Sequence, residues 1–212
     1  MRFVSRARWA LVGAVLCVLC AATVSAQADE LMTASAEVRG LLQWVSASRD
    51  PGDRAFAVVD KKGGTLYVFR ANGTLAGSTP ALLGAARGDQ SAPGVGLLRP
   101  EQIAPHERTT PAGRFASLPG RNHEGEHIVW VDYDTAIAIH RLRPGASYAP
   151  RSARLASGGG DDNRVSYGCI VVPEAFYDSV VRPVLGQGAG VVYVLPDSLP
   201  LERVFAGLAS AG

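Results

Sequence analysis

The pattern of apolar and polar residues along most of the chain predicts short β-strands joined by tight turns. Apolar runs at 55–60 and 65–70 flank Lys61-Lys62-Gly63-Gly64, a combination typical of a β-hairpin. Further strand-like runs occupy 75–83, 128–133, 136–140, 190–195 and, after a turn, the end of 110–115. Because such closely spaced strands favour a closed or layered sheet over βαβ units, the predicted fold class is mostly β, a sandwich or barrel with a few short helices.

Helical spacing of apolar residues is confined to three segments. Residues Glu30 to Ser48 place leucine and valine at intervals of three and four, which predicts an amphipathic helix. Pro173 suits the first residue of a second helix, which Pro183 should end or kink. A third, short helix is expected within 199–211. Two stretches without periodicity are rich in glycine, proline or charge and predict an irregular surface loop and a flexible loop; these are 84–109 and 141–163.

The first residues of the chain have the pattern of a secretory signal peptide. Three arginines precede the uncharged apolar run from Trp9 to Leu19, and the small residues Val24-Ser25-Ala26 follow it. The apolar run is short for a membrane span, which disfavours an anchor. We therefore expect cleavage after Ala26 and export to the periplasm or cell envelope, with no membrane span in the mature protein.

Removal of this signal changes the charge balance. The chain has 21 basic and 19 acidic residues, and three of the basic ones but no acidic one lie in 1–26. The remaining residues therefore carry a net charge of about −1, so the basic isoelectric point gives no support for nucleic-acid binding. We expect a helical extension at 27–54, one domain at 55–197, and a tail or short helix at 198–212.

Cys169 is the first candidate for chemistry. The other two cysteines, Cys17 and Cys20, lie in the predicted signal, so an exported protein would keep one thiol without a disulfide partner. Small and polar residues surround it in the segment 161–170. A buried cysteine that acts as a small apolar residue is one interpretation, and a nucleophile is the other.

A nucleophilic thiol needs a base, and His140 is the candidate among four histidines. It closes a strand-like run, so a rigid element would hold it in place. His123 and His127 flank two glutamates and suggest a metal site as an alternative. Gly125 between them discourages the helix that this spacing would need, so a solvated turn is favoured and no metal is expected.

Three collinear segments of the chain resemble the L,D-transpeptidase catalytic domain. His140 followed by Ser166-Tyr167-Gly168-Cys169-Ile170 is similar to the His, spacer, Ser/Thr-x-Gly-Cys signature of that family. Residues 56–70 resemble its opening hairpin, and Thr110-Pro111-Ala112-Gly113-Arg114-Phe115 its Thr-Pro-x-Gly-x-Phe turn. The resemblance covers about 55–196 and implies an L,D-transpeptidase-like β-sandwich or barrel.

The resemblance also implies the reaction. Cys169 would attack a carbonyl of a peptidoglycan stem peptide with His140 as base, and backbone N–H groups of Gly168 and Cys169 would face the oxyanion. Ser166 would support the site by a hydrogen bond, with a plain turn serine as the alternative. Arg164 would hold a stem carboxylate, with a surface charge as the alternative, and Tyr167 is included among the substrate-binding residues.

A thioester formed at Cys169 would pass to an acceptor, and this route requires no cofactor. With a second stem peptide as acceptor, the product is a 3-to-3 crosslink. With water, the enzyme is a carboxypeptidase or a hydrolase of a murein–protein link. With an envelope protein, the reaction anchors that protein to the wall. A non-catalytic peptidoglycan-binding module is the alternative from another class. Three features depart from the family: the 25-residue spacer after His140 is long, Tyr167 replaces a frequent histidine, and Val171 replaces an asparagine or arginine.

Overall fold

The computed structural model describes residues 31–206. The predicted signal at 1–26 lies outside the described residues, as does the end of the predicted terminal helix. One compact unit begins at Ser35 and contains every strand, and residues 31–34 belong to a separate unit. Within 31–206, no helix is long and apolar enough to cross a membrane.

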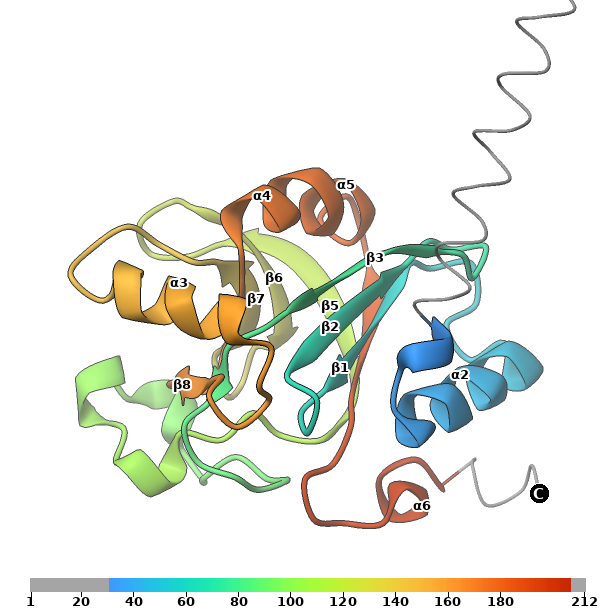
Figure 1. Ribbon diagram of the computed structural model, residues 1–212, viewed down its shortest axis with the longest axis horizontal. Coiled ribbons are helices and arrows are strands. Elements are labelled where there is room, and N and C mark those ends of the chain that lie inside the picture. Colours follow the sequence, from blue (N-terminus) through green and yellow to red (C-terminus); the bar gives the residue numbers. More distant parts are fainter. Residues whose placement is uncertain (1–30, 207–212) are drawn as a thin grey trace, which may run out of the picture. The chain divides into compact units, whose positions relative to one another are not determined.

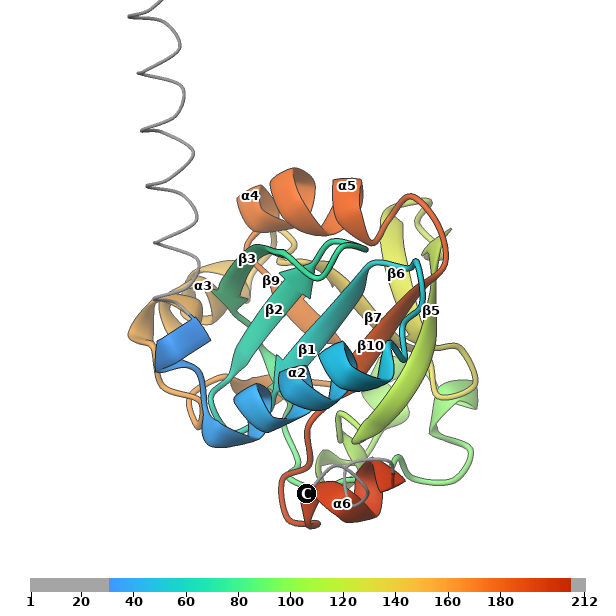
Figure 2. The same ribbon diagram turned by 90° about the vertical axis from the view of Figure 1, so that its right-hand side faces the viewer.

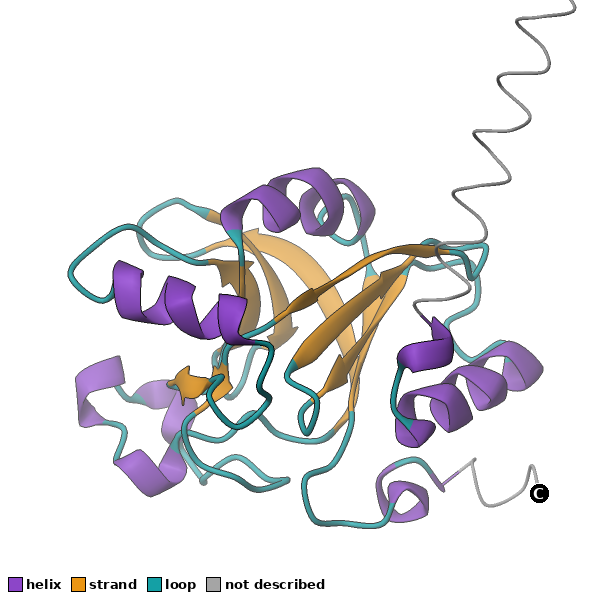
Figure 3. Cartoon of the chain, viewed as in Figure 1, coloured by secondary structure: helices purple, strands orange, loops and turns teal. Residues whose placement is uncertain are grey.

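The compact unit is built on one sheet of eight strands with short helices at its margins (Figure 3), which confirms the predicted fold class. The strands follow the apolar runs of the sequence within a few residues. In chain order they are β1 (Phe56–Asp60), β2 (Thr65–Phe69), β3 (Leu75–Pro80), β5 (Gly113–Arg121), β6 (His127–Asp132), β7 (Ile137–Arg141), β9 (Ile170–Val172) and β10 (Gly190–Val194).

The sheet is nearly closed into a barrel, in the order β3-β2-β1-β10-β5-β6-β7-β9. The predicted hairpin forms, with Asp60 paired to Thr65 across the four-residue turn. The last strand, β10, inserts between β1 and β5 and runs parallel to β1. The two ends of the sheet meet where Leu82, just after β3, exchanges backbone hydrogen bonds of 2.8 and 2.9 Å with Val171 of β9.

The helix α2 (Ala36–Ser48) lies across the outer face of β1 and β10 (Figure 2). Ser35 begins it as an N-cap by accepting a hydrogen bond of 3.2 Å from the N–H of Val38. On its inner face, Trp44 makes an edge contact with Tyr193 of β10. Because α2 covers one face and the barrel core the other, every residue of β1 and β10 is buried. Residues 35–54 of the predicted extension thus belong to the compact unit.

A second helical segment follows β9, as Pro173 predicts. It starts with α4 (Glu174–Phe176), passes through a π-helical turn η4 (Tyr177–Val181) and ends with α5 (Arg182–Val184). Tyr177 and Val181 enter the main apolar core with residues of the barrel interior. A short terminal helix, α6 (Leu201–Val204), lies within the segment predicted to contain one.

The expectation of an unstructured loop at 141–163 is wrong, because residues Tyr148–Ser157 form the helix α3 outside the barrel (Figure 1). Leu155 is its one buried residue, and Gly158 ends it in the left-handed conformation. Because only one residue of this helix is buried, its apolar residues do not repeat at helical spacing in the sequence. The sequence pattern therefore did not predict the helix.

The other predicted loop, 84–109, is irregular but contains three single 3-10 turns. They are η1 (Val95–Leu97), η2 (Pro100–Gln102) and η3 (Pro105–Glu107). At its start the short strand β4 (Leu83–Gly84) pairs in parallel with β8 (Arg164–Ser166). This pairing brings the loop beneath the segment that carries Cys169.

Candidate functional site

Cys169 stands between β8 and β9, directly after a glycine in a conformation that other residues rarely adopt. Gly168 has a φ of +130°, and a Cβ there would lie 2.6 Å from Cδ1 of Ile137 and 3.0 Å from the carbonyl oxygen of Thr109. Both the dihedral angle and the close approach require glycine. The resulting sharp turn fixes the direction in which the Cys169 side chain leaves the backbone.

Ser166 closes this turn with two hydrogen bonds. Its Oγ donates to the carbonyl oxygen of Cys169 at 2.6 Å and accepts from the N–H of Gly168 at 3.1 Å. Ser166 is therefore a buried support of the turn. Because the N–H of Gly168 is already donated to Ser166, only the N–H of Cys169 is left of the two groups expected to face an oxyanion.

The same turn is held from below by a buried threonine. Thr110 Oγ1 donates to the carbonyl oxygen of Gly168 at 2.7 Å and accepts from the N–H of Gly84 at 2.9 Å. The carbonyl oxygen of Thr110 in turn accepts from Nζ of Lys61 at 3.0 Å. The Thr-Pro turn that the sequence marks as a motif is thus a direct support of the cysteine turn.

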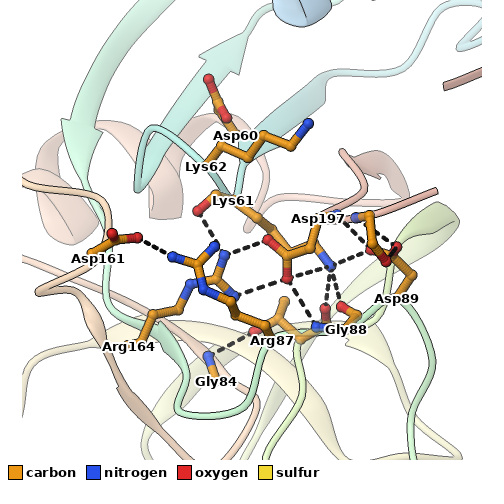
Figure 4. A network of polar contacts seen from close by, with 12 residues as sticks. Asp60, Lys61, Lys62, Gly84, Arg87, Gly88, Asp89, Asp161, Arg164 and Asp197 are labelled. Atoms are coloured by element: carbon orange, nitrogen blue, oxygen red, sulfur yellow. Dashed lines mark hydrogen bonds and ion pairs between the residues drawn. The ribbon is translucent and has the colours of Figure 1, made fainter. Parts of the chain in front are cut away.

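Lys61 belongs to a buried polar network drawn in Figure 4. Its side chain is fully buried and also donates to the carbonyl oxygen of Gly88 at 2.6 Å and to Asp89 at 3.0 Å, while Asp197 lies 3.4 Å away. Burial alone raises the pKa of the Asp89 carboxyl, but N–H groups of residues 197–199 and the Lys61 ammonium more than offset it. The pKa of Asp89 therefore lies well below its usual value.

Arg164 belongs to this network and not to a binding surface. Its guanidinium pairs with both carboxylate oxygens of Asp197 and donates to the carbonyl oxygen of Lys61 at 2.9 Å. The side chain is 7% exposed and that of Asp197 is 3% exposed. This corrects the expectation that Arg164 holds a substrate carboxylate, because its charge is already compensated inside the fold.

His140 stands on β7 beside β9, opposite Val171 in the parallel register. Its Nδ1 lies 2.8 Å from the carbonyl oxygen of Arg141. A carbonyl oxygen only accepts, so Nδ1 carries the hydrogen and Nε2 of the neutral ring is unprotonated. Burial lowers the pKa of His140 to about 4, which keeps the ring neutral at pH 7. The imidazole is thus in the form that a general base requires.

The Cys169 thiol is partly exposed and free of any disulfide. It contacts the carbonyl oxygen of Ala136 at 3.6 Å, where Ala136 has a φ of +57° in the turn between β6 and β7. Burial raises the pKa of the thiol, and a backbone hydrogen bond with Ala138 and the positive charges of Arg143 and Arg151 oppose that shift. Within 31–206, no hydrogen bond joins the thiol to His140. The pairing of β7 with β9 sets His140 opposite Val171, two residues after Cys169.

Arg143 and Arg151 are residues of the site that the sequence did not reveal. Arg143 lies two residues after β7 and pairs with Glu126 at 2.7 Å and Glu124 at 3.3 Å. Arg151 lies on α3, one turn before the buried Leu155. The segment that holds both was interpreted as a loop, so no pattern directed attention to them.

Val171 is 1% exposed and packs in a small apolar cluster with Leu82, Leu142 and Leu155, against which Cys169 also packs. The long segment between His140 and Ser166 and the apolar residue at position 171 are therefore linked. The segment contains α3, and Val171 helps to anchor this helix. Tyr167 is 43% exposed beside this region.

The guanidinium of Arg108 lies 4.4 Å from the centre of the Tyr167 ring. Tyr167 therefore forms part of the exposed surface next to the turn of Cys169, with one face of its ring covered by a positive charge. This is a position from which a side chain can contact a ligand.

The histidines considered for a metal site have other partners. Nδ1 of His127 lies 2.9 Å from the hydroxyl of Tyr177, and His123 is exposed with Glu124 3.8 Å away. Across residues 31–206, no group of three or more histidine, cysteine, aspartate or glutamate side chains is arranged to hold a metal ion.

Comparison with known proteins finds no matching family model and no matching curated protein. Among solved structures, the chain is similar to the NMR structure of the catalytic domain of an E. faecium L,D-transpeptidase. The identity is 21%, the TM-score is 0.36, and the match covers 68% of this chain and 98% of that one.

Proposed function

We propose that the protein is an exported cysteine acyltransferase that acts on peptidoglycan stem peptides, an L,D-transpeptidase. The observation that carries the proposal is the pairing of β7 with β9, which sets a neutral imidazole beside the strand that Cys169 precedes. A base without a proton on Nε2, a free thiol and a rigid glycine turn are the parts that acyl transfer through a thioester needs. The peptidoglycan substrate rests on the sequence resemblance.

In the first half-reaction, the thiol proton passes to Nε2 of His140 while Sγ of Cys169 attacks the carbonyl carbon of the donor peptide. The carbonyl oxygen gains the electron pair, and the N–H of Cys169 is the candidate donor to it. Collapse of the adduct breaks the C–N bond, and the departing amine takes the proton from His140. The product is a thioester on Cys169.

In the second half-reaction, the amine of a second stem attacks the thioester carbonyl and loses its proton to His140. The C–S bond breaks, and the proton returns to the sulfur of Cys169. An attack by water in the same place would give carboxypeptidase activity. Burial raises the pKa of the thiol, so the sulfur needs a base to take its proton as it attacks.

The proposal is tested by incubating residues 27–212 with a carbapenem and, separately, with isolated murein rich in tetrapeptide stems. We expect a covalent adduct on Cys169 by intact-mass analysis and new crosslinked or trimmed stems in the muropeptide profile. Cys169→Ala is the control and should give neither. Wild-type protein that gives no adduct and no altered muropeptide, alongside an active control enzyme, would refute the proposal.

A further inference from the structure

Arg151 on α3 is a positive charge without an acidic partner. Within residues 31–206 it takes part in no ion pair, and its Nε is buried without a hydrogen-bond partner. The residue is half-buried. A guanidinium that loses part of its hydration without gaining a carboxylate carries a free-energy cost that a bound anion would relieve.

Arg151 lies on the face of α3 that packs against the cysteine strand. Leu155, four residues further on, lies on the same face of the helix and packs with Val171 and Leu142, and Cys169 packs against that cluster. Arg151 is therefore one helical turn from the contact that joins α3 to the cysteine strand. Electrostatics agree with this placement: burial lowers the pKa of Arg151, Arg143 lowers it further, and the charges of Cys169 and Tyr167 oppose the shift.

The neighbouring arginines differ from Arg151 in that each already has a partner. Arg143 pairs with Glu126 at 2.7 Å, Arg164 pairs with Asp197, and the guanidinium of Arg108 lies over the ring of Tyr167. Of these four arginines in the described chain, Arg151 alone has neither an ion pair nor a contact with an aromatic ring. Because Arg143 is paired with two glutamates, Arg151 is the one of the two whose positive charge stays unpaired in the described chain.

We propose that Arg151 binds a free carboxylate of the acyl donor, next to the carbonyl that Cys169 attacks, so that the enzyme selects anionic donors. The inference deepens the proposed function and rests on it for the identity of the donor. Val171, two residues after Cys169, offers the donor no polar group, since its side chain is buried among apolar residues. A planar guanidinium can hold a carboxylate by two parallel hydrogen bonds, which fixes orientation as well as charge.

The first experiment compares two alkylating reagents at Cys169, iodoacetate and iodoacetamide, which differ in charge and hardly in size. In wild-type protein, the anionic reagent should react faster relative to the neutral one than it does with a free thiol. Arg151→Gln should lower this ratio by about fivefold, the size expected for one partly screened charge, and Arg151→Lys should keep most of it. Arg154→Gln, an equal loss of charge on the exposed side of the same helix, is the matched control and should leave the ratio unchanged.

The second experiment measures kcat/KM for a donor peptide with a free carboxylate beside the scissile carbonyl and for its amidated counterpart. Arg151→Gln should raise KM for the acid at least fivefold and leave the amide unchanged. A shifted alkylation ratio without turnover would uphold the anion site and refute the proposed function. Turnover in which neither the alkylation ratio nor the acid-to-amide preference depends on Arg151 would uphold the function and overturn this inference.

Discussion

The two sides of the Cys169 turn differ in whether their charged side chains have ion-pair partners. Beneath the turn, Lys61, Asp89, Asp197 and Arg164 form a buried network in which every charge has an opposite charge within 3.4 Å (Figure 4). Beside it, an apolar cluster anchors α3, and Arg151 extends from that helix without an ion-pair partner in the described chain. Compensated charges hold the turn in place, while the uncompensated one is available to a ligand.

Residue type alone does not show which arginine near Cys169 is free to bind a ligand. Arg164 lies five residues before the cysteine and was expected to bind substrate, yet its guanidinium is buried against Asp197. Arg151 lies 18 residues before the cysteine in a segment without a visible period. Arg164 is the closer of the two to Cys169 in the sequence, but it lies on β8, which pairs with β4, and its side chain belongs to the buried network.

The largest expected effect separates these two arginines by stability. Arg164→Gln should lower the free energy of unfolding by about 3–5 kcal/mol, because it leaves the buried carboxylate of Asp197 without its main partner. Arg151→Gln should change it by less than about 1 kcal/mol, since no ion pair is lost. Urea unfolding of both variants measures the difference. Equal losses of unfolding free energy in the two variants would show that Arg151 is a structural residue and that the two sides of the Cys169 turn do not differ in this way.

A smaller effect is expected from the apolar anchor of α3. Leu155→Ala should cost about 2–3 kcal/mol, because it opens a cavity next to Leu142 and Val171. Since the helix would no longer hold Arg151, the preference for iodoacetate over iodoacetamide should fall as it does in Arg151→Gln. Leu97→Ala, at a side chain that is 91% exposed, is the control and should leave both quantities unchanged. A preserved reagent preference in Leu155→Ala would show that α3 is held by other contacts.

The smallest effect is a pH dependence of stability that comes from His140. Its pKa is about 4 in the folded protein and about 6.5 in the unfolded chain, so only the unfolded chain takes up the proton as pH falls below 6.5. The stabilisation is complete above pH 6.5 and is lost as pH falls toward 4. Between pH 7.5 and 5, wild-type protein should lose on the order of 1–2 kcal/mol more than His140→Gln.

Urea midpoints at the two pH values give this comparison. Asp89 and Asp197 contribute little to it, because the pKa of each carboxyl lies below its usual value and both stay ionised at pH 5. His123→Gln is the control and should keep the wild-type slope, since the His123 side chain is 84% exposed. If His140→Gln has the same slope as wild type, the imidazole is not desolvated and its assignment as a neutral base loses its support.

The sequence by itself determined the strands, the hairpin and the candidates for chemistry. Short apolar runs bounded by turn residues are a local signal, so β1, β2, β6 and β7 could be located from them. A cysteine after Ser-Tyr-Gly and a histidine at the end of an apolar run were likewise visible, because each depends on its immediate neighbours.

The tertiary structure alone decided which of those candidates lie on adjacent strands and which charges have no ion-pair partner. The insertion of β10 between β1 and β5, and the pairing of β7 with β9, join segments that are far apart in sequence and leave no local signal. The same holds for α3, whose one buried residue, Leu155, packs against Val171 of β9, a residue distant in sequence. Whether an arginine has an ion-pair partner depends on residues that folding brings from elsewhere in the chain, and for this reason the sequence did not distinguish Arg164 from Arg151.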